Sequence, residues 1–361
     1  MRIGIFYDNL LTIGGAEKHV LQLADALCAE IITSGHTDDV RKWISPKTKI
    51  NNLGNLIFRV NKPLGILFET PFRFLINKNR FNYDVNIFIG FSSIFASSKN
   101  KKNIYYNLIP HRLFYDKDSI KLKKFNLLQI IILKLYVITF KKWSENLIAN
   151  NFDKIITQSK TAQVKIKSTY RKSAIIIPPP IDIKKYIFKT FGDFYLTVGR
   201  LYPEKRLELL VDAFKKLPNK KLIIVGSGPL KQKLINRIGL ADNIQLLSNL
   251  SEKKLQQLYS NCLATIYMPK DEDFGLVPLE GMAAGKACIA ANEGGCKETV
   301  IDGKTGFLIN ATEKDIIKAI KKLDLKEAKK MKNNCLRWVK KFDTKECIKQ
   351  WKKELNIFKT V

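Results

Sequence analysis

Residues 194–225 read FYLTVGRLYPEKRLELLVDAFKKLPNKKLIIV, and this stretch decides the class of fold. Its two apolar runs, 194–198 and 221–225, are rich in β-branched and aromatic residues, which is typical of buried strands. Between them, residues 205–216 carry apolar side chains at helical spacing. A strand, a helix and a second strand in this order predict a βαβ unit with both strands parallel in one sheet.

The same alternation of strand and helix continues on both sides of this stretch. It predicts parallel sheets with helices on both faces, so we expect an α/β protein with two doubly wound domains. The expected strands are 2–7, 85–89, 104–106, 155–157, 174–177, 244–247, 264–267 and 287–291. The expected helices follow Gly15 and Leu230, span 121–149, 253–259 and 277–284, and recur after residue 313.

The chain of 361 residues has room for two domains. Three prolines at 178–180 forbid a helix and mark the natural junction. We therefore expect domains at 1–178 and 179–340, and a helix at 341–361 that returns to the first domain. Ligands of doubly wound sheets bind beyond the carboxyl ends of the strands, which predicts a site in the cleft between the domains.

Composition narrows the classes of partner. The chain carries 63 Lys and Arg against 33 Asp and Glu, a net charge of +30, which favours nucleic acid, an anionic membrane or phosphorylated substrates. Zinc-finger spacing, an RNA-binding aromatic motif and a basic zipper are missing, so we expect no nucleic-acid partner. A lysine-rich solvated surface explains the charge equally well.

The six cysteines are scattered without a CxxC pair, which predicts reduced thiols of a cytosolic protein rather than a zinc site or disulfide framework. The opening MRIGIFYDN does not have the pattern of a signal peptide. The apolar run 125–140 is short for a membrane span and contains Lys134. We expect no transmembrane segment.

Two segments, 56–80 and 121–142, mix apolar residues with Lys and Arg. This composition is typical of a helix that lies in a membrane interface, and both segments are also compatible with ordinary core helices.

Three motifs carry the chemistry of anion binding. Gly14-Gly15 precedes a helix, where backbone N–H groups and the helix dipole favour a phosphate, although a simple turn also explains the pair. Arg200 follows the strand 194–198, and Lys205 comes five residues later. A guanidinium fork and an ammonium suit a diphosphate, although such cations also occur at solvated helix starts.

The third motif is EDFGLVPLE, in which Glu272 and Glu280 flank a helix start. Backbone N–H groups at residues 274–277 can bind an anion. Glu280 can accept hydrogen bonds from a ribose diol and Glu272 from sugar hydroxyls. Surface glutamates favoured by the helix dipole are the alternative interpretation.

Together, these motifs make the chain resemble a family 4 glycosyltransferase, which has the GT-B fold. The resemblance covers about residues 2–310. It rests on Gly14-Gly15 with Glu17, Pro179-Pro180-Ile181-Asp182, Gly199-Arg200 with Lys205, Val225-Gly226-Ser227-Gly228-Pro229, Glu272 with Glu280, and Gly294-Gly295, Glu298, Gly303 and Gly306-Phe307.

The resemblance implies a role for each of these residues. Arg200 and Lys205 stabilise the departing diphosphate, and Glu272 holds the donor sugar. The donor-binding set is Gly14, Gly15, Arg200, Lys205, Gly226, Glu272, Phe274, Gly275, Leu276, Val277 and Glu280. The resemblance further implies retention of anomeric configuration, no cofactor and no essential metal, with an acceptor-binding first domain and a nucleotide-sugar-binding second domain.

Residues 106–116, YNLIPHRLFYD, are similar to a stretch of some mannosyltransferases of surface-polysaccharide assembly. That stretch has a histidine where this chain has Leu108, so His111 is the candidate that replaces it as a catalytic group, or it is an ordinary loop histidine. Arg112 and Tyr115 are the candidates for binding the acceptor.

The resemblance thus predicts a hexosyltransferase that uses GDP-mannose or a UDP-hexose. We expect its acceptor to be a growing, lipid-linked glycan at the cytoplasmic face of the membrane. The alternatives are a soluble transferase for a small sugar or storage polysaccharide, and a catalytically inactive nucleotide-binding scaffold.

Overall fold

A computed structural model describes residues 1–11, 14–37, 40, 43, 45–54, 63–111 and 127–356. The chain forms two compact units. The first contains Met1–Pro180 and Cys347–Val361, and the second contains Ile181–Glu346. The three prolines at 178–180 close the first unit, and the chain from Cys347 onward belongs to it again.

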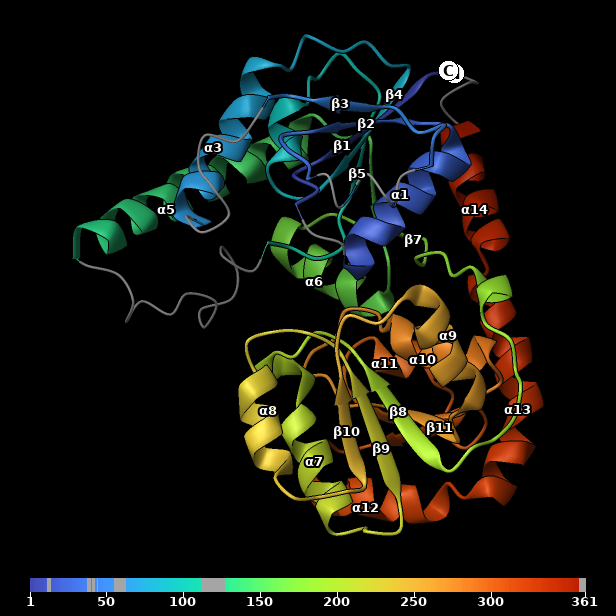
Figure 1. Ribbon diagram of the computed structural model, residues 1–361. Helices are drawn as coiled ribbons and strands as arrows, with labels where there is room; N and C mark the ends of the chain where they lie inside the picture. The colour runs from blue at the N-terminus through green and yellow to red at the C-terminus, as the bar shows by residue number, and fades with distance from the viewer. Residues whose placement is uncertain are drawn as a thin grey trace. The chain divides into compact units, whose positions relative to one another are not determined.

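The first unit is built on a seven-stranded sheet in the order β3-β2-β1-β4-β5-β6-β7, with every neighbouring pair parallel (Figure 1). Its strands are β1 (Ile3–Tyr7), β2 (Glu30–Thr33), β3 (Ile50–Asn52), β4 (Val85–Ile89), β5 (Asn103–Tyr106), β6 (Lys154–Thr157) and β7 (Ile175–Ile176). Its described helices are α1 (Gly15–Leu27), α3 (Pro63–Ile76), η1 (Ser93–Ala96), α5 (Leu127–Asn150), α6 (Lys160–Tyr170) and most of α14 (Thr344–Asn356).

Helices cover both faces of this sheet because alternate strand residues point to opposite sides. On one face, Tyr106 packs with α1 and with Trp351 of α14. On the other face, Tyr105 packs in a cluster that includes Phe74 of α3 and Tyr136 of α5. Trp351 is fully buried, so the C-terminal helix is an integral part of the first unit's core.

The second unit has a six-stranded parallel sheet in the order β10-β9-β8-β11-β12-β13 (Figure 1). Its strands are β8 (Phe194–Val198), β9 (Lys221–Val225), β10 (Ile244–Leu247), β11 (Ala264–Tyr267), β12 (Cys288–Ala291) and β13 (Gly306–Ile309). Its helices are η3 (Ile183–Lys185), η4 (Pro203–Lys205), α7 (Leu207–Lys215), α8 (Lys231–Ile238), α9 (Glu252–Asn261), α10 (Leu276–Ala283), α11 (Cys296–Thr299), α12 (Glu313–Lys322), α13 (Leu325–Val339) and η5 (Lys340–Phe342).

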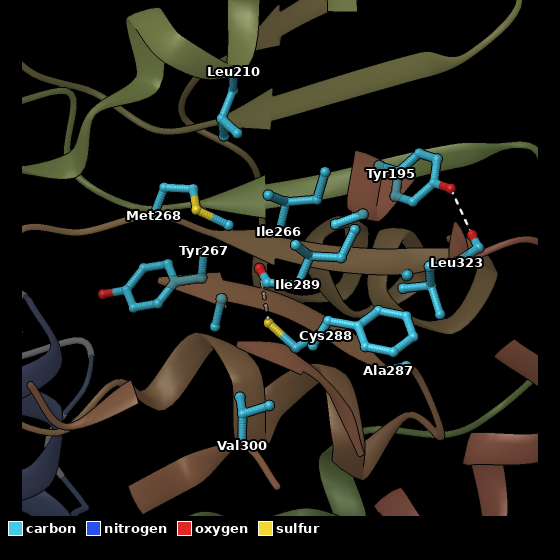
Figure 2. Close-up of a cluster of buried hydrophobic side chains, with 14 of the residues drawn as sticks. Tyr195, Leu210, Ile266, Tyr267, Met268, Ala287, Cys288, Ile289, Val300 and Leu323 are labelled. Atoms are coloured by element: carbon cyan, nitrogen blue, oxygen red, sulfur yellow. Dashed lines mark hydrogen bonds between the residues drawn. The ribbon is translucent and has the colours of Figure 1, made fainter. Parts of the chain in front are cut away.

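The core of the second unit lies between the sheet and these helices (Figure 2). Ile266 of β11 and Ile289 of β12 are fully buried beside Leu210 of α7. The hydroxyl of Tyr195 on β8 donates a hydrogen bond to the Leu323 carbonyl, 2.7 Å away. This bond satisfies a polar group in an apolar environment, where an unpaired hydroxyl would be costly.

The structure corrects the sequence prediction in a few places. The helix expected over 205–216 begins only at Leu207, because Lys205 ends the short helix η4 and Arg206 has a left-handed φ of 50°. The strands β2, β3 and β13 were not predicted from the sequence. Of the stretch expected to be helical over 121–149, residues 121–126 lie outside the described part of the chain.

Helix α5 carries both buried and exposed apolar side chains. Leu133 and Tyr136 are buried in the core of the first unit, whereas Leu135 and Ile138 are more than 60% exposed. Among the described residues, no helix is long and apolar enough to cross a membrane.

Candidate functional site

The loop after β8 is fixed in place by the loop after β9. The Leu201 N–H donates to the Ser227 carbonyl at 2.8 Å, and the Leu230 N–H donates to the Leu201 carbonyl at 3.1 Å. A Cβ atom on Gly226 would lie 1.9 Å from the Gly199 carbonyl oxygen, so this position requires glycine. Gly226 thus permits the close approach of two loops, and its predicted contact with the donor stays a prediction.

Arg200 and Lys205 both lie beyond the carboxyl end of β8, where parallel sheets bind ligands. The Arg200 side chain is exposed, with its guanidinium 5.3 Å from the centre of the Tyr202 ring. Lys205 is largely buried, with 15% of its side chain exposed. The two cations therefore differ, one reaching solvent and one held in the protein.

Lys205 is held by Glu272 and Tyr267. Its Nζ atom lies 2.5 Å from Glu272 Oε2 and 3.1 Å from the Tyr267 hydroxyl, which is itself 2.8 Å from the same carboxylate oxygen. The Tyr267 hydroxyl points away from the buried cluster of the core (Figure 2). Burial, followed by the charge of Glu272, raises the pKa of Tyr267 well above its usual value, so its proton stays on the oxygen.

Gly294 and Gly295 shape the loop that carries Glu272. The Gly295 N–H donates to the Glu272 carbonyl at 2.6 Å. A Cβ on Gly294, which has a φ of 51°, would lie 2.2 Å from that carbonyl oxygen, and a Cβ on Gly295 would lie 2.3 Å from the Phe274 Cα atom. The two glycines are therefore required for the close contact between these backbones.

Helix α10 begins immediately after this loop. Gly275 is its N-cap, with a φ of 93°, and Leu276 and Val277 are the first helical residues. The first N–H groups of a helix have no acceptor within the helix, and the dipole makes this end attractive to anions. Phe274 to Val277 thus lie at a helix start next to the Lys205–Glu272 pair.

Glu280 lies one turn further along α10 and is held by Tyr259. The Tyr259 hydroxyl donates to Glu280 Oε2 at 2.6 Å. Burial is the main cause that raises the pKa of Tyr259 well above its usual value, and the Glu280 charge adds to it. The phenol of Tyr259 therefore keeps its proton, and its hydrogen bond orients the carboxylate.

Gly14 and Gly15 belong to the first unit, where they start helix α1. Glu17 accepts hydrogen bonds from the Gly14 N–H and from the Tyr7 hydroxyl, both at 2.9 Å. Glu17 therefore ties the glycine turn to the end of β1. A role of the glycines in donor binding stays a prediction.

His111 also belongs to the first unit, and its ring centre lies 5.0 Å from that of Phe91. Burial lowers the pKa of His111 to about 4, so the imidazole is neutral at pH 7. Its catalytic role stays a prediction. Arg112 and Tyr115 lie outside the described residues.

The sequence analysis missed the tyrosines that hold the two glutamates. Tyr267 is the last residue of the predicted strand 264–267, a position that faces the ligand-binding edge of a parallel sheet and could have drawn attention. Tyr259 offered no such signal, because it lies on α9 and fits the buried face of an ordinary amphipathic helix. Within the described part of the chain, no group of three or more His, Cys, Asp or Glu side chains is placed to hold a metal ion.

Comparison with known proteins identifies the family of the domain that carries this site. Residues 180–338, nearly the whole second unit, match the model of the group 1 glycosyl transferases. The second unit therefore contains a group 1 glycosyl transferase domain. The glycosyltransferase resemblance drawn from the sequence motifs is thereby confirmed.

Named relatives match part of this chain. The alpha-1,3/1,6-mannosyltransferase ALG2 of Dictyostelium discoideum is 35% identical over 174 residues, 41% of this chain and 39% of that protein. An uncharacterized glycosyltransferase of Methanocaldococcus jannaschii is 33% identical over 208 residues, 55% of this chain and 58% of that protein. The chain thus matches less than two thirds of the length of either relative.

Solved structures match the chain over nearly its whole length. Sucrose-phosphate synthase from Thermosynechococcus elongatus has a TM-score of 0.79 at 17% identity, with both chains fully covered. HepE of Anabaena, in complex with UDP and glucose, has a TM-score of 0.74 at 18% identity, covering 99% of this chain and 100% of that one. These matches confirm the GT-B fold with its two parallel sheets.

Proposed function

We propose that the protein is a hexosyltransferase that moves a sugar from GDP-mannose or a UDP-hexose to a growing, lipid-linked glycan. The observation that carries this proposal is the contact of Lys205 with Glu272 beside the start of α10. A cation and a helix N-terminus that converge beyond parallel strands suit a diphosphate, and the carboxylate suits the hydroxyls of the attached sugar.

In the proposed reaction, the bond between the anomeric carbon and the diphosphate oxygen breaks, and negative charge develops on the nucleoside diphosphate. Arg200 and Lys205 stabilise this charge, together with the N–H groups at the start of α10. Glu272 holds the sugar and Glu280 binds the ribose. The acceptor hydroxyl attacks from the face that the diphosphate leaves, and its proton passes to the departing phosphate oxygen. Attack from this face retains the anomeric configuration. Fixed cations supply the electrostatic stabilisation, so we propose that the reaction needs no essential metal.

The names of similar proteins support both classes of donor. A mannosyltransferase from Dictyostelium discoideum supports a mannosyl donor, and the Anabaena structure in complex with UDP and glucose supports a uridine nucleotide. The donor base and sugar are therefore left as two candidates that a binding experiment separates.

The surface of α3 and α5 supports an acceptor carried by a membrane. The two helices are neighbours, since the Phe68 and Tyr136 ring centres are 4.4 Å apart (Figure 1). Exposed apolar side chains lie on both helices, among exposed cations. The apolar residues are Phe72, Ile76, Leu127, Ile131, Ile132, Leu135 and Ile138, and the cations are Lys78, Arg80, Lys134 and Lys142.

On α5, the residues Leu127, Ile131, Leu135 and Ile138 are three or four positions apart and therefore share a helix face. An apolar helix face with nearby lysines fits the interface of an anionic membrane. We therefore propose that this surface docks on the cytoplasmic face of the membrane, where sugars are added to lipid-linked acceptors.

The first test is calorimetric titration of the protein with GDP and with UDP, followed by turnover of the matching nucleotide sugar. Binding of one nucleotide, weakened in Glu280→Ala, would support the proposal and identify the donor class. Turnover with a free sugar or storage polysaccharide instead of a lipid-linked glycan would favour the alternative acceptor. Binding without turnover of any donor would favour a nucleotide-binding scaffold.

A further inference from the structure

Arg206 and Glu293 form a paired contact in the second unit that none of the proposed chemistry uses. Two guanidinium nitrogens of Arg206 donate to the two carboxylate oxygens of Glu293, at 2.6 and 3.2 Å. The side chains are 22% and 35% exposed, so the pair is partly shielded from solvent. Two parallel hydrogen bonds fix both the distance between the two side chains and their relative orientation. A lysine, with a single contact, would fix only the distance.

The pair joins the two segments that carry the candidate catalytic contact. Arg206 directly follows Lys205, and Glu293 directly precedes Gly294 and Gly295, the glycines that approach the backbone of Glu272. The Gly295 N–H donates to the Glu272 carbonyl at 2.6 Å. A displacement of Arg206 relative to Glu293 would therefore displace Lys205 relative to Glu272.

Further contacts extend this connection to the start of the Glu272 loop. The Asp271 N–H donates to Glu293 Oε2 at 3.4 Å, and the Lys270 N–H donates to the Glu204 carbonyl at 2.7 Å. The loops after β8, β11 and β12 are thus cross-linked within a few residues of Lys205 and Glu272.

The backbone of Arg206 has an unfavourable conformation. Its φ of 50° lies in the left-handed region, which is unfavourable for residues with a Cβ and relaxed for glycine. The chain nevertheless has an arginine here, and the side chain of that arginine is committed to Glu293. A glycine at this position would therefore relax the backbone and remove the contact with Glu293 at once.

We propose that Arg206 and Glu293 are positioning residues that hold Lys205 and Glu272 in the relative position that the transfer reaction requires. This inference rests on the proposed function. It requires that the pair acts as a unit, through geometry and without touching the donor. If Arg206 instead contacted the donor phosphates as a third cation, Glu293 would be dispensable.

The test is a double-mutant cycle of Arg206→Gly, Glu293→Gln and the double variant. Arg206→Gly relieves the backbone strain, so its melting temperature should equal or exceed that of the wild type while kcat falls roughly 10- to 100-fold, the cost of a small misplacement of catalytic groups. Glu293→Gln should lower kcat similarly with little change in nucleotide affinity. The double variant should be no worse than either single variant.

Arg237→Gln is the matched control, because Arg237 forms a comparable two-point pair with Asp212 that joins α8 to α7 outside the site loops. Its kcat should equal that of the wild type. Additive losses in the cycle, or full activity of Glu293→Gln, would overturn the proposal.

Amide hydrogen exchange separates this inference from the proposed function. In Glu293→Gln, the segments 199–206 and 269–275 should exchange faster than in the wild type, with the rest of the second unit unchanged. Unchanged exchange in both segments would overturn the positioning role, whatever the activity. If the wild type turned over no nucleotide sugar, the proposed function would fail, and exchange would still decide whether the pair holds these loops.

Discussion

The ammonium of Lys205 lies 2.5 Å from a carboxylate oxygen of Glu272, although the two residues are 67 positions apart in the chain. The Tyr267 hydroxyl contacts both groups. An ammonium has three N–H donors, and this arrangement uses two of them. The third is left for another acceptor, so in the proposed function Lys205 can bind a phosphate oxygen of the donor without releasing Glu272.

Replacing Lys205 by alanine should lower kcat/KM for the nucleotide sugar by about 10²- to 10³-fold, because a fixed cation at the leaving group is lost. Release of nucleotide from the donor, in the presence of acceptor, measures the effect. Lys231→Ala, at an exposed position at the start of α8, is the matched control and should have wild-type activity. Wild-type turnover by Lys205→Ala would remove this residue from the catalytic site.

Replacing Tyr267 by phenylalanine should lower kcat about fivefold and leave nucleotide affinity nearly unchanged. The ring remains and the core stays filled, while the hydroxyl that orients Lys205 and Glu272 is lost; one hydrogen bond of this kind is worth about 1 kcal/mol. Steady-state kinetics and nucleotide titration on the same preparation give the two quantities. An equal loss in affinity and kcat would contradict an orienting role.

Glu280→Ala should weaken nucleotide binding and also lower the melting temperature. The second effect follows because the fully buried Tyr259 hydroxyl loses its acceptor, at a cost of about 1–3 kcal/mol. The double variant Glu280→Ala/Tyr259→Phe removes the orphaned hydroxyl and should recover part of the melting temperature without recovering nucleotide affinity. Recovery of both would mean that Glu280 acts only through the fold.

Replacing Leu135 and Ile138 by glutamate should reduce sedimentation of the protein with anionic liposomes. Both side chains are exposed on α5, so the change removes apolar contact and adds negative charge without disturbing the core. The matched control is Ile235→Glu with Leu240→Glu, two exposed apolar residues in the second unit. Equal sedimentation of the two double variants would contradict docking through α5.

The burial of His19 predicts that the first unit loses stability at acid pH. Burial lowers the pKa of His19 from 6.5 to about 3, and neither ring nitrogen has a hydrogen-bond partner among the described residues. Between these two pKa values the unfolded chain binds a proton that the folded chain does not. The free energy of unfolding should therefore fall as the pH drops below about 6.5, by about 1.4 kcal/mol per pH unit.

His19→Phe removes this titration, so the stability difference between variant and wild type should shift by about 2 kcal/mol in favour of the variant from pH 7 to pH 5. Urea unfolding at the two pH values measures it. Comparing the two proteins cancels other groups, such as Asp8, whose pKa burial raises to about 6 and whose effect has the opposite sign. A difference independent of pH would contradict a neutral buried His19.

The neighbours of His19 allow a related test. Its ring centre lies 5.3 Å from that of Tyr106, which lies 5.1 Å from that of Trp351. The Tyr106 hydroxyl and the Trp351 Nε1 atom are also buried without a partner in the described part of the chain. Tyr106→Phe should therefore leave the melting temperature unchanged or raise it, and a lower melting temperature would contradict an unpaired hydroxyl.

Much of this structure could be read from local patterns in the chain. The apolar runs at 194–198 and 221–225 predicted strands with the bounds that the structure has, because a buried parallel strand needs only a short continuous apolar segment. Gly294 and Gly295 could be noted as a motif, but only the structure relates them to the backbone of residues 272–274. The extent of α7 was overestimated, since hydrophobic periodicity does not report the left-handed turn at Arg206.

The sequence by itself determined the two parallel-sheet domains and the candidates Arg200, Lys205, Glu272 and Glu280, because periodicity and motif spacing are local properties of the chain. Only the tertiary structure decided that Lys205 meets Tyr267 and Glu272, that Glu280 is held by Tyr259, and that Arg206 pairs with Glu293. These partners are 21 to 87 positions apart. Lys205 and Arg206 meet their partners because parallel strands bring the segments at their carboxyl ends to one edge of a sheet. Tyr259 and Glu280 lie on the helices α9 and α10. In both cases, no local pattern in the chain records which side chains touch.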